Sequence, residues 1–192
     1  MRVDPASFEG AYAATEDPWD FATSEYEQHR YDALESLLRP LAGSGAHPYR
    51  RCFEPACSVG VLTERLAARC DEVVAVDPSR SAVATARARL AGVDHVAVEV
   101  GAIPEWWPAG TFDLVVFAEV GYYWDVPGLT DVLGRLARLR AAGGDLVAVH
   151  WLGTSPDHLL SGHDVHATMV DLFGDPAERL DDPGFVAAAW RS

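Results

Sequence analysis

The sequence RCFEPACSVGVL, residues 51–62, predicts how the rest of the chain is organised. It begins as a short apolar strand and passes through a turn of small residues, 56–60, into a helical pattern. Small residues let a ligand approach the backbone, and the start of a helix offers free N–H groups and the positive end of the helix dipole. We therefore expect a cofactor to bind at this turn.

Strands and helices alternate after the turn. Apolar runs typical of buried strands lie at residues 51–55, 72–76, 96–100, 112–118 and 145–149. Helical patterns follow residues 60, 79 and 128. Elements in this order form a parallel sheet with right-handed crossovers. The prediction is an α/β, Rossmann-like, doubly wound fold with helices on both faces of the sheet.

The two ends of the chain are less regular. Residues 1–21 carry aromatic side chains without a clear period, which predicts an irregular arm. Leucines and tyrosines at three- and four-residue spacings predict a long helix over residues 24–41, with Ser24 as its N-cap, ended by Pro40 or Gly43. The tail predicts a helix near residues 164–173 and two short strands, around Arg179 and at residues 185–190.

No repeat or linker points to a second domain. We expect one domain over residues 1–192, with an N-terminal arm and lid helices in residues 1–45 and a Rossmann-like core in residues 50–192.

Composition limits the class of partner. The 192 residues carry 15 basic and 29 acidic side chains, a formal charge of -14. Such a charge repels phosphate backbones and anionic lipid, so we expect neither a nucleic acid nor a membrane partner. It suits a neutral or cationic small molecule, although solubility alone also explains an acidic surface.

Cysteine usage and the N-terminus indicate the compartment. Cys52, Cys57 and Cys70 are odd in number and lack a Cys-x-x-Cys spacing, so they read as small buried hydrophobic residues in a reducing environment. The first residues are acidic and contain no apolar core of a signal peptide. We expect a cytoplasmic protein that is a monomer or a homodimer.

The turn distinguishes between two kinds of nucleotide-like cofactor. A dinucleotide fingerprint needs glycines at 56, 58 and 61, where the chain has Ala56, Ser58 and Val61, so a pyrophosphate site is disfavoured. The first motif of methyltransferases needs an acid at 54 and glycines at 56, 58 and 60. Glu54 and Gly60 match that motif, and small residues replace the other two glycines.

Asp77 adds weight to the second interpretation. It ends the second predicted strand, where a carboxylate can accept both hydroxyls of an adenosine ribose. The alternative role is an N-cap for the next helix, and the two roles are compatible.

With these features the chain resembles class I S-adenosylmethionine-dependent methyltransferases, and among them the nodulation protein S family of N-methyltransferases. The resemblance covers nearly the whole length. It rests on Asp17-Pro-Trp-Asp-Phe21 with Tyr26-Glu27 and Arg30-Tyr31, on Glu54 to Gly60, on Asp77, on Phe112-Asp-Leu-Val-Val116, on Ala118-Glu-Val-Gly-Tyr-Tyr123, and on Ala142-Gly-Gly-Asp-Leu-Val147.

The resemblance implies a seven-stranded sheet with an antiparallel last strand, S-adenosylmethionine over the first two strands, and an N-terminal lid. Many class I enzymes place an acid after the glycine that ends strand three, but here Gly101 is followed by Ala102. Adenine recognition then falls to backbone groups of Ala102 and Ile103. The expected cofactor-binding residues are Arg30, Glu54, Ala56, Ser58, Gly60, Asp77, Pro78, Ala102, Ile103 and Glu119.

Three residues are candidates for catalysis. Glu119, after strand four, can hold an ammonium group or take its proton, or can form a structural salt bridge. Tyr122 can line the methyl channel, and His150, at the end of strand five, can be a base or a hydrogen-bonded structural histidine. No metal is expected, because only the spacing of His163 and His166 suggests a metal pair.

The predicted function is N-methylation of a small amine-bearing molecule such as an amino sugar or a deacetylated amino-oligosaccharide. One alternative is O-methylation of a sugar or secondary metabolite, which would need His150 as base. Another, from a different class, is a non-catalytic ligand-binding module, suggested by the missing glycines at 56 and 58. Trp106 and Trp107 either shield the adenine or form an apolar plug under their loop.

Overall fold

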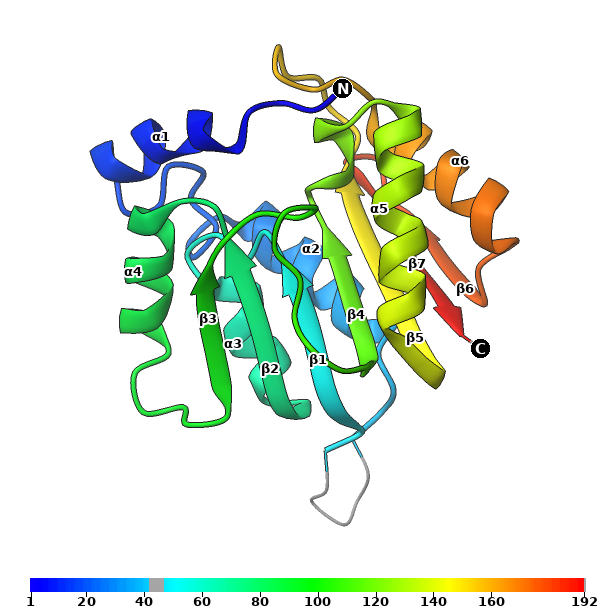
Figure 1. Cartoon of the computed structure of the whole chain (residues 1–192), viewed down its shortest axis with the longest axis horizontal. Coiled ribbons are helices and arrows are strands. Elements are labelled where there is room, and N and C mark those ends of the chain that lie inside the picture. Colours follow the sequence, from blue (N-terminus) through cyan, green and yellow to red (C-terminus); the bar gives the residue numbers. More distant parts are fainter. Residues whose placement is uncertain (42–46, 192) are drawn as a thin grey trace.

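The structure, a computed structural model, describes residues 1–41 and 47–191. The described residues form a central seven-stranded sheet with the order β3-β2-β1-β4-β5-β7-β6 (Figure 1). The first five strands are parallel, and β7 is antiparallel to both of its neighbours. This confirms the predicted α/β, doubly wound fold and its antiparallel last strand.

The elements have the following bounds. The strands are β1 Tyr49–Pro55, β2 Cys70–Asp77, β3 Val96–Val100, β4 Phe112–Ala118, β5 Arg140–Trp151, β6 Glu178–Asp181 and β7 Phe185–Arg191. The α-helices are α1 Glu9–Ala14, α2 Glu25–Ser36, α3 Val61–Ala67, α4 Arg80–Arg89, α5 Val126–Leu139 and α6 Gly162–Phe173, and the 3-10 helices are η1 Pro5–Phe8 and η2 Gly121–Tyr123.

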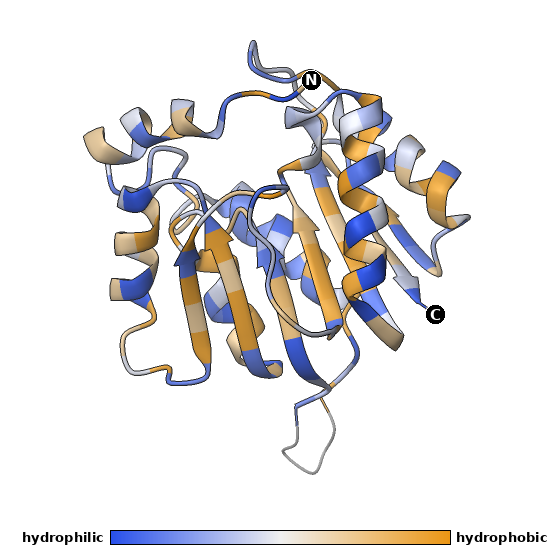
Figure 2. Cartoon of the chain, in the orientation of Figure 1, coloured by the Kyte–Doolittle hydropathy of each residue, from blue (hydrophilic) through white to orange (hydrophobic). Residues whose placement is uncertain are grey.

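Side chains alternate along each strand, so apolar residues point from both faces of the sheet, and helices cover both faces. Leu114 and Val116 of β4 pack in one cluster with buried side chains of α2 and α3. Val115 and Phe117, one position on, pack in the other cluster with α5 and α6. Apolar residues accordingly dominate the central strands in Figure 2, whereas α5 carries an apolar stripe and a polar one. No described helix is long and apolar enough to span a bilayer.

Several element boundaries differ from the predictions. The N-terminal arm is partly helical, since η1 and α1 form within it. Helix α2 ends at Ser36, before the predicted stop at Pro40, and Gly43 lies outside the described residues. Ser24 is the N-cap residue of α2 by position, but its side chain makes no capping hydrogen bond.

Strand β5 begins five residues earlier than predicted, and Gly143 and Gly144 lie inside it. Gly143 has φ 75°, a conformation that favours glycine, and the pairing of β4 with β5 shifts register between Phe112 and Leu114. The strand therefore continues through an irregularity instead of starting after it.

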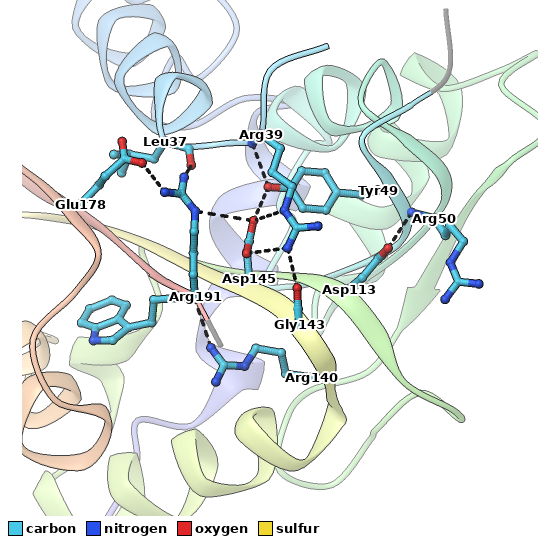
Figure 3. Close-up of polar contacts among 11 residues, drawn as sticks. Leu37, Arg39, Tyr49, Arg50, Asp113, Arg140, Gly143, Asp145, Glu178 and Arg191 are labelled. Atoms are coloured by element: carbon cyan, nitrogen blue, oxygen red, sulfur yellow. Dashed lines mark hydrogen bonds and ion pairs between the residues drawn. The ribbon is translucent and has the colours of Figure 1, made fainter. Parts of the chain in front are cut away.

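A buried carboxylate, Asp145 of β5, ties this end of the sheet together (Figure 3). Its Oδ2 accepts hydrogen bonds from the Tyr49 hydroxyl at 2.7 Å and from Arg39 Nε at 2.9 Å, and its Oδ1 accepts one from Arg39 Nη2 at 2.9 Å. Arg191 of β7 lies 3.9 Å away. These contacts join β1, β5, β7 and the segment after α2, far from the carboxyl ends of the parallel strands.

Candidate functional site

A cavity of about 430 Å³ lies at the carboxyl ends of the parallel strands, the edge where an open α/β sheet binds its ligand. The ends of β1 to β5, helix α2 and the N-terminal segment all contribute to its wall. The predicted site residues that line the cavity are Arg30, Ala56, Ser58, Asp77, Pro78, Ala102, Ile103, Glu119 and Tyr122. Glu54, Gly60 and His150 do not line it.

The turn after β1 has the backbone that its motif predicts, although two glycines of the motif are missing. Ala56 and Ser58 adopt φ 60° and 53°, and Gly60 adopts φ 79°. The left-handed region disfavours side chains by about 1–2 kcal/mol per residue, so this turn is strained. A Cβ on Gly60 would lie 3.0 Å from Cβ of Ala86, so this glycine serves the packing of α3 against α4.

Asp77 links the turn after β1 to the start of α4. Its Oδ2 accepts the N–H of Ser58 at 2.9 Å and its Oδ1 accepts the N–H of Ser79 at 2.9 Å. The N-cap of α4 is Ser79, whose hydroxyl accepts the N–H of Ala82. Burial raises the pKa of Asp77 to about 6. The two N–H donors oppose this shift because they stabilise the charged form. The carboxylate is thus held in a fixed orientation at the cavity wall.

Glu54 belongs to the interior and not to the cavity wall. It is 2% exposed and accepts a hydrogen bond from the Thr63 hydroxyl at 2.7 Å. Burial raises its pKa to about 8. The acid of the motif therefore fastens β1 to α3 in this chain.

Glu119 and Arg30 form the polar centre of the cavity wall. Glu119 Oε2 lies 2.8 Å from Arg30 Nη1 and accepts the Tyr122 hydroxyl at 2.7 Å. Its Oε1 accepts the N–H of Trp151 at 2.7 Å. Arg30 also pairs with Glu27, one turn earlier on α2, and its buried Nε has no hydrogen-bond partner among the described residues. The cluster therefore has one donor still available in the interior.

The cluster holds more acid than base. Burial raises the pKa of Glu119, with the charge of Arg30 opposing the shift. Burial likewise raises the pKa of Glu27 to about 7, again opposed by Arg30. Glu119 has φ 55°, a strained conformation for a side-chain-bearing residue that is common at functional sites.

His150, predicted as a base, lies in the packing between β5 and α6. It is fully buried, its Nε2 accepts the N–H of Gly121 at 3.1 Å, and its Nδ1 faces His166 Nε2 at 3.3 Å. Burial holds its pKa well below the usual range. Because side chains alternate along a strand, His150 points with Ala148 toward the α5 and α6 face and not into the cavity.

The N-terminal arm closes one side of the cavity, which sequence periodicity did not reveal. The Tyr12 hydroxyl donates to Ser58 Oγ at 2.6 Å, and Glu9 accepts the hydroxyls of Ser79 and Ser81 at 2.7 Å each. The N–H of Val3 donates to the carbonyl of Tyr123 at 2.9 Å. The aromatic residues of the arm and the lid implied by the family resemblance were the available signals. Figure 1 shows the arm crossing above the strand ends.

The end of β5 and the segment after it close another side and were also missed as part of the site. Trp151, Ser155, Asp157 and His158 line the cavity. A loop rich in glycine, serine and proline carries no periodic signal, so its return to the site could not be read from the sequence.

Trp106 and Trp107 do not line the cavity. Their rings lie 6.3 and 6.4 Å from that of Phe53 in the apolar cluster under the loop. Cys52, Cys57 and Cys70 are buried and free. Among the described ranges, no group of three or more His, Cys, Asp or Glu side chains is arranged to hold a metal ion.

The strand order and a cavity over the ends of β1 and β2 define the fold of class I methyltransferases. The nodulation protein S family model matches residues 11–162. The chain is 32% identical to nodulation protein S of Rhizobium tropici over 89% of this chain and 71% of that protein. The corresponding protein of Bradyrhizobium diazoefficiens is 28% identical over 88% of this chain and 78% of its own length.

The chain therefore belongs to the nodulation protein S family of S-adenosylmethionine-dependent methyltransferases, as the sequence motifs predicted. Among solved structures it superposes on the N-methyltransferase NodS from Bradyrhizobium japonicum WM9 in complex with S-adenosyl-L-homocysteine, with a TM-score of 0.81. The two chains are 24% identical over 97% of this chain and 96% of the other, so this likeness supports the fold.

Proposed function

We propose that the protein uses S-adenosylmethionine to N-methylate a small amine-bearing molecule, with an amino sugar or a deacetylated amino-oligosaccharide as the acceptor. The observation that carries this proposal is the charge of the cavity wall. Glu27, Asp77, Glu119 and Asp157 line it, against Arg2 and Arg30. The charge of Arg2 is paired with Glu105, which does not line the cavity; Arg2 Nη1 lies 2.8 Å from Glu105 Oε2. Such a wall favours a cationic ligand over an anionic one.

The residues of the wall fit the cofactor. The buried, unpartnered Nε of Arg30 is a donor suited to a carboxylate such as that of the methionine part. Asp77 would hold the ribose hydroxyls, the turn at Ala56 and Ser58 would lie under the methionine part, and backbone groups of Ala102 and Ile103 would hold the adenine. Pro78 would contribute to the apolar wall beside Asp77.

When bound, S-adenosylmethionine supplies a methyl group on a sulfonium, which a neutral amine can attack. The chain has to orient the acceptor, exclude water and accommodate the proton that the amine loses. Tyr12, Trp19 and Tyr26 give the cavity aromatic walls suited to excluding water or packing against a ring. Glu119 and Asp157 supply the negative charge for an ammonium group.

The position of His150 bears on the choice between amine and hydroxyl acceptors. O-methylation was predicted to depend on His150 as base, but this side chain is fully buried behind the cavity wall. An amine needs a weaker base than a hydroxyl does, since its own proton is more acidic once it is an ammonium. The hydroxyl alternative therefore lacks the base that it was predicted to use.

The suggestion of a non-catalytic module rested on the missing glycines. Ala56 and Ser58 nevertheless adopt the left-handed backbone that glycine would provide, so the turn keeps its shape. The reason for that alternative is thereby removed.

Two measurements test the proposal. Calorimetry should detect binding of S-adenosylhomocysteine, and mass spectrometry should detect a mass gain of one or more methyl groups on a glucosamine tetramer. The matched control is the fully N-acetylated tetramer, which has the same hydroxyls and no free amine. Methylation of both tetramers to the same extent would show hydroxyl transfer and overturn the amine proposal.

A further inference from the structure

His158, in the loop between β5 and α6, is a cavity residue to which no role has been assigned. Its ring stacks on that of Tyr122, with centroids 3.7 Å apart and an angle of 18° between the planes. The ring of Tyr123 meets it edge-on at 5.5 Å and that of Trp151 at 6.0 Å. Three aromatic side chains therefore fix the orientation of this imidazole.

The backbone of the loop is anchored to the same tyrosine. The N–H groups of Leu159 and Leu160 donate to the carbonyl of Tyr122 at 2.8 and 3.3 Å, and the N–H of His158 donates to the carbonyl of Ser155 at 3.1 Å. Tyr122 in turn donates its hydroxyl to Glu119. Tyr122 thus contacts both His158 and Glu119 at the cavity wall.

Neither ring nitrogen of His158 has a hydrogen-bond partner in the part of the chain that the structure describes. Nδ1 is buried, so Nε2 is the nitrogen that a ligand can reach. Burial lowers the pKa of His158, opposed by the charge of Asp157. The titratable groups around the ring are Tyr122 and Tyr123 from η2, Asp157 from its own loop, and His150 behind Tyr122. The imidazole is therefore neutral near pH 7.

The other candidate bases are engaged elsewhere. Both oxygens of Glu119 accept hydrogen bonds or pair with Arg30, and Glu27 is paired with Arg30 as well. His150 does not reach the cavity. Asp157 accepts the Ser155 hydroxyl and lies beside His158, where its charge would stabilise an imidazolium.

We propose that His158 is the catalytic base that takes the proton of the acceptor amine, an inference that rests on the proposed N-methylation. The acceptor ammonium gives one proton to Nε2 of His158 and becomes a neutral amine. The nitrogen lone pair then forms the N–C bond to the methyl group while the S–C bond breaks and the sulfur keeps its electron pair. The imidazolium afterwards returns its proton to water at the cavity mouth.

The test compares His158→Gln with the wild-type enzyme, using a glucosamine tetramer as acceptor. At pH 7 we expect kcat to fall about 100-fold in the variant, within the usual range for loss of a general base. KM should change by less than about threefold, because the lost group acts on the proton and not on binding. The deficit should shrink toward pH 9, where more of the amine is already neutral in solution.

His163→Gln is the matched control, since His163 is exposed on α6 and does not line the cavity. Calorimetry with S-adenosylhomocysteine checks that His158→Gln is folded and binds the cofactor product as the wild type does. A folded variant whose kcat stays within about threefold of the wild type across this pH range overturns the assignment. If the wild type binds S-adenosylhomocysteine but methylates no tetramer amine, the proposed function fails, and the role of His158 fails with it.

Discussion

The sheet carries a buried cluster of carboxylate and arginine side chains at each end. The two clusters differ in their ratio of acids to arginines and in which polar groups have partners. Asp145 is fully buried and accepts hydrogen bonds from Arg39 and Tyr49. Arg191 also lies nearby, so one acid pairs with two arginines. At the cavity, Arg30 serves two acids, Glu119 and Glu27.

Hydrogen-bond partners and solvent access distinguish the two clusters. The side chains of Arg39 and Arg191 are 38% and 34% exposed and do not line the cavity, so water can solvate their charge. The side chain of Arg30 is 3% exposed and keeps an unused Nε in the interior. A buried donor without a partner costs free energy unless a ligand supplies one. A carboxylate and arginine cluster therefore ties strands together at one end of the sheet, and at the other end it keeps a buried donor in the cavity wall.

Replacing Arg30 should produce the largest effect. Arg30→Met leaves Glu27 and Glu119 without their cation in a buried place, so we expect a loss of about 3–5 kcal/mol in the free energy of unfolding. Affinity for S-adenosylhomocysteine should also fall. Urea denaturation and calorimetry measure the two effects, with the exposed Arg80→Met as control. A stable variant with normal affinity would contradict the role given to this cluster.

The Asp145 cluster should respond in stability alone. Asp145→Asn removes the charge that binds Arg39 and places an amide N–H₂ group against the donors of Arg39 and Tyr49. We expect the free energy of unfolding to fall by about 2 kcal/mol. The loss is smaller than for Arg30 because both arginines can turn to water. Affinity for S-adenosylhomocysteine should stay the same. Asp131→Asn, on an exposed part of α5, is the control. A lower affinity of Asp145→Asn for S-adenosylhomocysteine would contradict the proposed difference between the two clusters.

Glu27 should give a pH-dependent effect that distinguishes the two ends. Its folded pKa of about 7 lies above the ordinary 4.5, so the folded protein keeps a proton that the unfolded chain releases between these values. Stability therefore falls as pH rises through this window. Glu27→Gln should be more stable than the wild type by about 1 kcal/mol at pH 8, with the advantage fading toward pH 4.

Thermal melts from pH 4 to pH 8 measure the Glu27 effect. Glu25→Gln, an exposed acid in the first turn of the same helix, should show no such trend. A Glu27→Gln advantage that is constant with pH would show that folding does not change the pKa of Glu27.

The smallest expected effect is at the strained turn. Ala56→Gly relieves a left-handed conformation that costs about 1–2 kcal/mol, and the greater freedom of glycine in the unfolded chain offsets part of it. The net gain should be about 0.5 kcal/mol in urea denaturation. Ala97→Gly, in the extended strand β3, should instead lower the free energy of unfolding by about 0.5–1 kcal/mol. Equal losses at both positions would show that Ala56 is not strained.

Much of the fold was predictable because strands covered on both faces need continuous apolar runs. Strands β3 and β4 were predicted with their observed bounds, Val96–Val100 and Phe112–Ala118. The start of β5 was not, because a glycine pair that usually breaks a strand here lies within an irregular part of one. The helices of the N-terminal arm were missed because short helices without a periodic apolar face give no signal.

The sequence by itself determined which residues stand at the strand ends. Asp77 and Glu119 follow apolar runs, and the carboxyl ends of parallel strands meet at one edge, so both were expected at the cavity and both line it. Only the tertiary structure decided between the histidines. His150 ends a strand and turns toward α6, whereas His158 returns to the cavity because its loop is bonded to Tyr122. That choice depends on a contact across 36 residues of sequence, counted from Tyr122 to His158, which no local pattern encodes.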